Sequence, residues 1–127
     1  MRVCVVGGGA GGIELLLAMQ HRLIQELRKQ EHGGKMKSAA DVLELCVVTR
    51  GDTVLSSHPP SVQRVFRRVL RERNVSVHYG CNVRSVEELS PTSPSGYAGQ
   101  LVCGGGLEDS NADGERIPFD ECKIGRA

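Results

Sequence analysis

The feature that most constrains this chain is a block of glycines that ends an apolar segment near the first residue. Residues 3–6 (VCVV) are apolar, residues 7–12 read GGGAGG, and Ile13 begins a stretch with helical apolar spacing. A G-x-G-x-x-G pattern between a predicted strand and a predicted helix is typical of the turn that binds the phosphates of a dinucleotide. The sequence therefore predicts a strand, a glycine turn and a helix arranged as a dinucleotide-binding unit.

Each glycine of the pattern has a separate physical role in such a turn. Gly7 allows the tight turn after the strand, Gly9 lets the backbone approach a pyrophosphate, and Gly12 lets the helix pack closely on the strand. The start of the helix directs unpaired N–H groups and a partial positive charge at the phosphates. The predicted donors are the backbone N–H groups of Ala10, Gly11, Gly12 and Ile13.

The size and charge of the chain restrict its class. With 127 residues it is expected to form one domain, residues 1–127, with a core of its own. Its 16 basic and 15 acidic residues nearly cancel, and it has two Tyr, two Phe and no Trp, so a nucleic-acid partner is not expected. No apolar run approaches the length of a membrane span, and the first residues lead directly into a strand, which indicates no targeting peptide.

The cysteines and histidines show no spacing typical of a metal site. Cys4, Cys46, Cys81, Cys103 and Cys122 are odd in number and form no C-x-x-C pair, so neither a zinc site nor a disulfide framework is predicted. Cys4 and Cys46 lie in predicted strands and are interpreted as small buried apolar residues. Free thiols are typical of the cytoplasm or another reducing compartment, which is the location we expect. The four histidines are interpreted as structural or surface residues.

The first two-thirds of the chain alternates between strand and helix patterns. A helix is predicted from about residue 11 to about residue 30, and Gly33 and Gly34 indicate its end. Residues 42–49 form a nearly continuous apolar strand. Pro59 and Pro60 open a second helix, and residues 75–79 form a third strand. This β-α-β-α-β order predicts parallel strands joined by crossover helices.

The remaining residues change to short strands separated by polar loops. Residues 83–89, 100–103 and 116–119 are predicted to be short antiparallel strands. The acidic Gly-rich loop with Glu108 and Asp109 is interpreted as a solvated hairpin tip. The predicted fold is thus α/β, with a Rossmann-like, doubly wound parallel sheet and an antiparallel β-meander crossover.

Four segments in the same order resemble one superfamily of flavoproteins. Residues 3–19 (VCVVGGGAGGIELLLAM), 47–55 (VVTRGDTVL), 62–80 (VQRVFRRVLRERNVSVHYG) and 116–122 (RIPFDEC) resemble the NAD(P)H-binding domain of the pyridine nucleotide–disulfide oxidoreductases. Within that superfamily the chain looks most similar to type II NADH dehydrogenase-like flavoproteins, and in particular to the module fused in some proteins to selenide, water dikinase.

The resemblance implies that two cofactors work together. In the superfamily this domain positions the nicotinamide for hydride transfer to FAD, which flanking segments hold. This sequence has no second G-x-G-x-x-G, no further FAD-contact motif and no C-x-x-x-x-C redox pair. After residue 122 it also departs from the hydrophobic strand expected for the family. It is therefore expected to be a fragment of a larger FAD-dependent oxidoreductase, with a flavin-binding domain as its partner in cis or in trans.

Three further residues are candidates for contacts with the dinucleotide. Glu14 matches a family glutamate that lies near the nicotinamide, and an acid at a helix start is also favoured by the helix dipole alone. Thr49 and Arg50 follow the second strand, where an acid favours NAD and an arginine favours NADP. Thr49 stands where NAD-specific members usually have Glu, so the pair favours NADPH. The other interpretation of Arg50 is a surface turn residue, and the choice between NADH and NADPH stays open.

The residues leave two other functions open. One is a stand-alone nucleotide-binding or sensing module, because the chain has no catalytic constellation of its own. The other is a non-functional truncated product that folds poorly and exposes one face of its sheet. The electron acceptor belongs to the flavin side, so these residues do not identify it.

Overall fold

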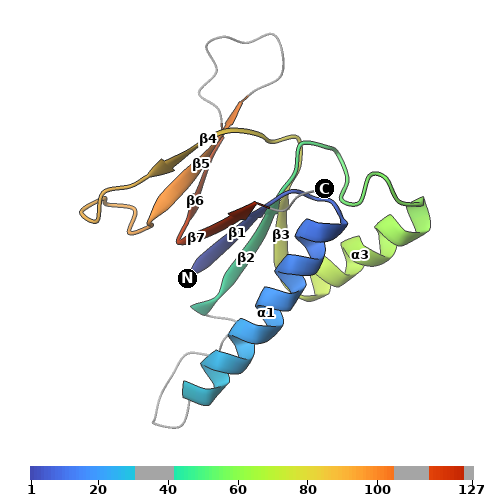
Figure 1. Ribbon diagram of the computed structural model, residues 1–127, viewed down its shortest axis with the longest axis horizontal. Coiled ribbons are helices and arrows are strands. Elements are labelled where there is room, and N and C mark those ends of the chain that lie inside the picture. The colour runs from blue at the N-terminus through green and yellow to red at the C-terminus, as the bar shows by residue number, and fades with distance from the viewer. Residues whose placement is uncertain (31–41, 105–114, 125–127) are drawn as a thin grey trace.

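The computed structural model describes residues 1–30, 42–104 and 115–124 (Figure 1). The loop glycines Gly33 and Gly34 and the acidic loop around Glu108 lie outside the described residues. The elements in chain order are β1 (Arg2–Val6), α1 (Ala10–Gln30), β2 (Glu44–Val48), α3 (Pro60–Glu72), β3 (Val75–His78), β4 (Asn82–Glu88), β5 (Gly99–Gly104), β6 (Arg116–Phe119) and β7 (Glu121–Ile124).

The first half of this order follows the sequence patterns closely. Helix α1 spans Ala10–Gln30, as the apolar spacing predicts. Helix α3 starts at Pro60, with Pro59 as its N-cap, so proline occupies the first turn, where a missing N–H costs no hydrogen bond. Both helix predictions are confirmed.

The parallel strands form one sheet with the order β3-β2-β1-β7. Strand β1 lies in the interior of this sheet, and its Cys4 is the register partner of Cys46 on β2 and of Cys122 on β7. Among the residues that the structure describes, strand β3 pairs with β2 alone and forms one edge of the sheet. Because all four strands run in the same direction, their carboxyl ends meet at one side of the sheet, where ligands of open α/β folds bind.

One face of the parallel sheet is covered by the two helices. Alternate strand residues such as Val3, Val5 and Val47 point to this face, because side chains on a strand alternate. They pack against Ile13 and Leu16 of α1, both essentially inaccessible to solvent. This aliphatic cluster, which we call the helix-side core, holds α1 and α3 on the sheet.

The opposite face is covered by a second, antiparallel sheet with the order β4-β5-β6 (Figure 1). Here the intervening strand residues, Cys4 on β1 and Cys46 and Val48 on β2, pack against Leu101 and Ile117. We call this cluster the sheet-side core. The parallel sheet, its crossover helices and the antiparallel strands confirm the fold class expected from the sequence.

Strand β7 is the element that the sequence patterns do not predict. It pairs in parallel with β1, which places Glu121 opposite Val3 and Ile124 opposite Val6. The tetrapeptide ECKI has too few apolar residues to carry a strand signal, and its β structure is a consequence of the free edge that β1 presents. The Asp120 carboxylate accepts a hydrogen bond from the Arg2 N–H at 2.6 Å, and the Asp120 N–H donates to the Arg2 carbonyl oxygen at 2.8 Å.

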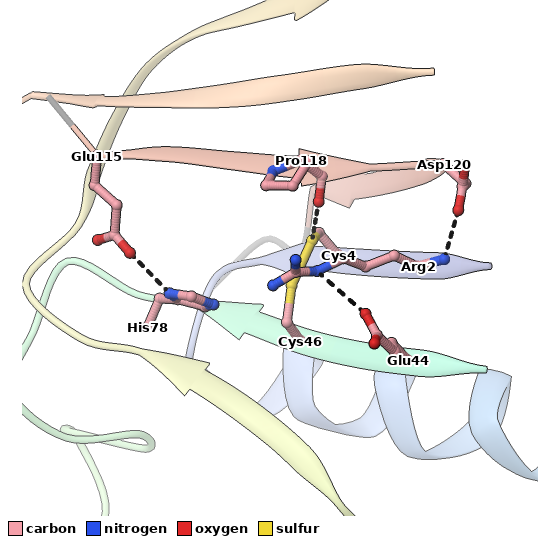
Figure 2. Close-up of a disulfide and its surroundings, with 8 residues drawn as sticks. All are labelled: Arg2, Cys4, Glu44, Cys46, His78, Glu115, Pro118 and Asp120. Atoms are coloured by element: carbon pink, nitrogen blue, oxygen red, sulfur yellow. Dashed lines mark hydrogen bonds and ion pairs between the residues drawn. A yellow bond between two sulfur atoms is a disulfide. The ribbon is translucent and has the colours of Figure 1, made fainter. Parts of the chain in front are cut away.

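The expectation that the cysteines form no disulfides is wrong. Cys4 and Cys46 are disulfide-bonded across β1 and β2 (Figure 2), and Cys81 and Cys103 are bonded between the segment after β3 and strand β5. The Cα atoms are 4.8 Å and 5.3 Å apart, within the range that a disulfide spans. Strand register brings Cys4 and Cys46 together, and the pairing of β4 with β5 brings Cys81, the residue before β4, next to Cys103. No spacing rule applied to the sequence contains these pairings.

The pairing changes what the cysteines say about the location of the protein. Cys122 is the free cysteine of the described residues and is partly buried. The expectation of a reducing compartment rests on free thiols. Four of the five cysteines are paired, so the cysteines do not support that expectation. Among the described residues, neither helix has the length and apolarity that crossing a membrane requires.

Candidate functional site

The glycine block forms a tight turn at the carboxyl end of β1. Gly7 has a φ of 121°, a left-handed conformation that favours glycine, and its N–H donates to the Val48 carbonyl oxygen at 2.8 Å. A Cβ atom on Gly12 would lie 2.1 Å from the Gly7 carbonyl oxygen. The first turn of α1 therefore touches the turn backbone, and only glycine fits at position 12.

The start of helix α1 leaves amide donors next to this turn. The Ile13 N–H donates to the Gly9 carbonyl oxygen at 3.1 Å, which makes Gly9 the residue that caps the helix. The Ile13 amide is thus already used, and its side chain is buried in the helix-side core. The amides of Ala10, Gly11 and Gly12 precede the first intrahelical bond and have no partner inside the helix. The donors available for an anion are these three.

Thr49 is held rigidly at the carboxyl end of β2. Its side chain is 8% exposed, and a Cβ atom on Gly8 would lie 2.7 Å from the Thr49 Oγ1. Its N–H donates to the His78 carbonyl oxygen at 2.9 Å, and its own carbonyl accepts from the Cys81 N–H at 3.0 Å. Thr49 therefore packs against the glycine turn and links β2 to the ends of β3 and β4.

The segment after Arg50 folds back over the glycine turn. The Leu55 N–H donates to the Gly8 carbonyl oxygen at 2.7 Å, and Leu55 has a left-handed φ of 54°. The Nε2 atom of Gln63 on α3 donates to the carbonyl oxygens of Leu55 and His58, at 3.2 Å and 2.9 Å. Gln63 thus fixes the loop that lies above the turn, a role that no sequence motif indicated.

These elements enclose a cavity of about 620 Å³ at the carboxyl ends of the parallel strands. It brings together four of the predicted residues, Gly7, Gly9, Thr49 and Arg50. The residues that the sequence reasoning missed come from the loop after β2 and from the start of β4: Thr53, Ser56, Ser57, Cys81, Asn82 and Val83. The general rule that ligands bind beyond the carboxyl ends of parallel strands would have pointed to both segments.

Glu14 lies apart from this cavity. It is exposed, in the second turn of α1, and it does not line the cavity. It also follows the first helical turn, Ala10–Ile13, in which no acid is present. Glu14 thus lies on the outer surface of α1.

The charge on the cavity lining is positive. Its described lining contains no carboxylate and one cation, the exposed guanidinium of Arg50. The partial positive charge of the α1 start adds to that of Arg50. Hydroxyl groups of Thr49, Thr53 and the two serines supply neutral donors and acceptors. The residues that the structure describes hold no cluster of three metal-binding side chains.

Comparison with known proteins supports the fold that positions these residues, and it does not extend to the residues themselves. No protein-family model and no curated sequence matches the chain. Among solved structures, a ferredoxin reductase from Rhodopseudomonas palustris is similar at a TM-score of 0.62 and 18% identity, over 99% of this chain and 24% of that one. NDH2 from Plasmodium falciparum, solved in complex with NADH, gives 0.69 and 11% identity, over 99% and 22%.

A third similar structure is LpdA from Mycobacterium tuberculosis, with a TM-score of 0.64 and 16% identity over 97% of this chain and 20% of that one. At such identities the likeness shows a shared fold. The chain spans about a fifth to a quarter of the length of these solved structures.

Proposed function

We propose that this chain is the NAD(P)H-binding domain of a flavin-dependent oxidoreductase. The observation that carries the proposal is the close approach of Gly12 to the Gly7 carbonyl, which holds the start of α1 against the glycine turn, and Gly7 and Gly9 of that turn line the cavity. A larger residue at position 12 would push the helix away, and the amide donors with it. A pyrophosphate at a glycine turn and helix start needs this geometry.

The residues present fit a nicotinamide dinucleotide in three places. The amides of Ala10, Gly11 and Gly12 would hold the pyrophosphate, and the open backbone at Gly9 would let it approach. The cavity wall at Thr49 and Arg50 would contact the adenosine ribose. When bound, the dinucleotide supplies a hydride, and the protein supplies its position and the surrounding charge.

The cavity wall favours NADPH over NADH. A carboxylate that would bond the 2′-hydroxyl of NADH, and would repel a 2′-phosphate, does not line the cavity within the described residues. Thr49 fills that position with a buried hydroxyl, and the Arg50 guanidinium is exposed beside it. Arginine pairs with phosphate oxygens through two parallel hydrogen bonds, so Arg50 would bind the 2′-phosphate.

Hydride transfer requires an acceptor, and we place that acceptor in a flavin-binding domain joined to or associated with this one. The shared fold with RclA from Escherichia coli, a flavoprotein disulfide reductase, supports this assignment. The described residues contain one glycine turn, which the dinucleotide would occupy, and offer no equivalent turn for FAD. The resemblance to the module fused to selenide, water dikinase stays a prediction, as does the position of Glu14 near the nicotinamide.

Isothermal titration of the purified chain with NADPH and NADH tests the binding part of the proposal. We expect NADPH to bind more tightly than NADH. The Arg50→Glu variant should bind NADPH at least about tenfold more weakly, because it replaces a charge-assisted phosphate contact by repulsion. Arg28→Glu, at the exposed far end of α1, makes the same change in net charge and should leave both affinities unchanged. Failure of a cooperatively folded chain to bind either dinucleotide would refute the proposal.

A second measurement separates a reductase domain from a stand-alone binding module. When the chain is extended by the flavin-binding segments of its own gene, NADPH should bleach the flavin absorbance under anaerobic conditions. Tight NADPH binding without bleaching would assign the domain to sensing or storage. Absence of a cooperative thermal transition in the isolated chain would favour a non-functional product.

A further inference from the structure

A second concave surface lies between helix α3 and the free edge of strand β3. It is an open groove of about 1130 Å³, and none of its lining residues lines the glycine-turn cavity. We call it the α3–β3 groove. Four arginines line it, Arg64, Arg67, Arg68 and Arg71, all on the exposed side of α3. The proposed dinucleotide site does not use any of them.

The groove carries an excess of positive charge. Of the four arginines, Arg68 has an acidic partner, Glu72, at 3.8 Å, and the described residues offer no ion pair to the other three. The groove lining contains no carboxylate within the part of the chain that the structure describes. Because the net charge of the whole chain is only +1, this local excess marks one surface rather than the whole molecule.

The wall opposite the arginines is an unpaired strand edge. Strand β3 (VSVH) pairs with β2 on one side, and in the described residues no strand covers its other side. Edge strands usually carry lysine, proline or a bulge that discourages pairing. β3 has none of these, so its outer N–H and C=O groups are open to another extended backbone.

The groove also exposes apolar surface. Val65 on α3 is 46% exposed and Tyr79, just after β3, is 42% exposed, and both line it. An occupant that suits all three features has a peptide backbone for the β3 edge, carboxylates for the arginines and apolar contacts for Val65 and Tyr79.

We propose that the α3–β3 groove binds an acidic, extended segment of a partner polypeptide, which adds to the parallel sheet as a further strand beside β3. Strand addition uses main-chain hydrogen bonds for affinity and side-chain contacts for selectivity. Here glutamate or aspartate side chains of the added strand pair with Arg64, Arg67 and Arg71. This proposal stands apart from the dinucleotide site and does not depend on it.

Other occupants fit less well. A second copy of this chain would bring its own arginine row against the first, and like charges oppose that contact. For a nucleic acid, Tyr79 is the single aromatic ring among the lining residues, which makes the groove a poor surface for base stacking. The open strand edge would also remain unpaired, because a nucleic acid has no peptide backbone. Both remain as outcomes of the test.

The test is fluorescence anisotropy with the full chain and a labelled octapeptide of alternating Glu and Val. Because side chains on a strand alternate between its two faces, all four glutamates of this peptide lie on one face. In one of the two orientations of the added strand, that face is directed toward α3. We expect this peptide to bind at least about tenfold more tightly than its Lys-Val counterpart, as expected when several charge pairs form instead of repelling. A version methylated on its backbone nitrogens keeps the carboxylates and loses the donors, and it should bind much more weakly.

Charge-reversal variants locate the site. Arg67→Glu should weaken the Glu-Val peptide about threefold to tenfold, because it converts an exposed attraction into a repulsion. Arg28→Glu, with the same change in net charge on α1, should have no effect, and NADPH affinity should be unchanged in both. In nuclear magnetic resonance spectra, the amides of β3 should shift on peptide binding.

Five results would overturn the proposal. The two peptides could bind equally, Arg28→Glu could weaken binding as much as Arg67→Glu, or the methylated peptide could bind as well as the parent. Tighter binding of an oligothymidylate than of the acidic peptide would assign the groove to nucleic acid. Dimerisation of the chain that Arg67→Glu abolishes and the peptide does not disturb would assign it to a second copy.

Discussion

The two faces of the parallel sheet are stabilised in different ways. The buried residues of the helix-side core are Val, Leu and Ile, and partly buried side chains such as Met19 and Phe66 of α1 and α3 pack against them. The sheet-side core has eight buried residues, and four of them are the disulfide-bonded cysteines. Short antiparallel strands supply few large side chains, so covalent links contribute where apolar packing is thin. The comparison predicts that the two faces respond differently to reduction and to mutation.

Reduction of the disulfides should have the largest effect. A native disulfide typically contributes about 2–4 kcal/mol, and both bonds lie in the sheet-side core. Urea unfolding of oxidised and reduced protein should therefore give clearly different free energies of unfolding. In denaturant, the oxidised protein should titrate one thiol, Cys122, and the reduced protein five. Five thiols in unreduced protein would show that the two faces differ in packing only.

Removing aliphatic volume from the helix-side core should have the next largest effect. Leu16 is fully buried between α1 and the sheet, so Leu16→Ala should cost about 2–5 kcal/mol of unfolding free energy, in oxidised and reduced protein alike. The adjacent Leu15 is 37% exposed and provides the control, since Leu15→Ala should cost less than about 1 kcal/mol. If reduction changed the cost of Leu16→Ala, the two cores would be coupled through the strands between them.

The turn that joins the two sheets should show an intermediate effect. Asp120 links β6 and β7 to β1 through its bonds with the Arg2 backbone. Asp120→Ala removes the carboxylate acceptor and should cost about 1–2 kcal/mol, as for a hydrogen bond to a charged group that is partly exposed. Asp120→Asn keeps an acceptor and should recover most of that loss in the same urea titration. Equal losses in both variants would mean that charge, not the hydrogen bond, matters there.

The smallest effect concerns the exposed surface of the antiparallel sheet. Hydrogen bonding from Gln100, followed by the charge of Arg116, lowers the pKa of Glu87 below its usual value. A lowered folded-state pKa means that the stabilisation is present above the unfolded-state pKa of Glu and is lost as the pH falls through the folded-state pKa. The stability difference between wild type and Glu87→Gln should therefore shrink as the pH falls from 7 to 3. Glu88→Gln, on the same strand, makes the same change in charge and serves as the control for it.

Much of the fold followed from sequence patterns because the patterns are local. The apolar spacing of α1 and the proline start of α3 each concern neighbouring residues, and both predictions are confirmed. β7 and the disulfides depend on strand pairing between residues far apart in the sequence, such as Cys4 and Cys46, which are 42 positions apart and lie opposite each other on β1 and β2. Register is a property of the assembled sheet, so the composition of ECKI and the spacing of the cysteines could not show it.

The residues of the candidate site also divide into those that a local sequence pattern indicates and those that only the assembled fold brings together. The glycine turn was visible in the sequence because its glycines are close together, and the structure shows a geometric reason for two of them, Gly7 and Gly12. The loop carrying Ser56 and Ser57 was not, because a glutamine on another element, Gln63, holds it over the turn. Whether the predicted contacts of Thr49, Arg50 and Glu14 form is a question for the titrations proposed above.

The pairing of β7 with β1 has a consequence for how the protein is made. Strand β1 is synthesised well before its second neighbour, which lies about 118 positions later in the chain, at residues 121–124. At about 5–20 residues per second, roughly 6–25 s pass before that neighbour exists. During this interval one edge of β1, next to the glycine turn, is open to other strands and to chaperones. The order of synthesis thus makes the proposed phosphate-binding turn the last part of the sheet to gain its complete support.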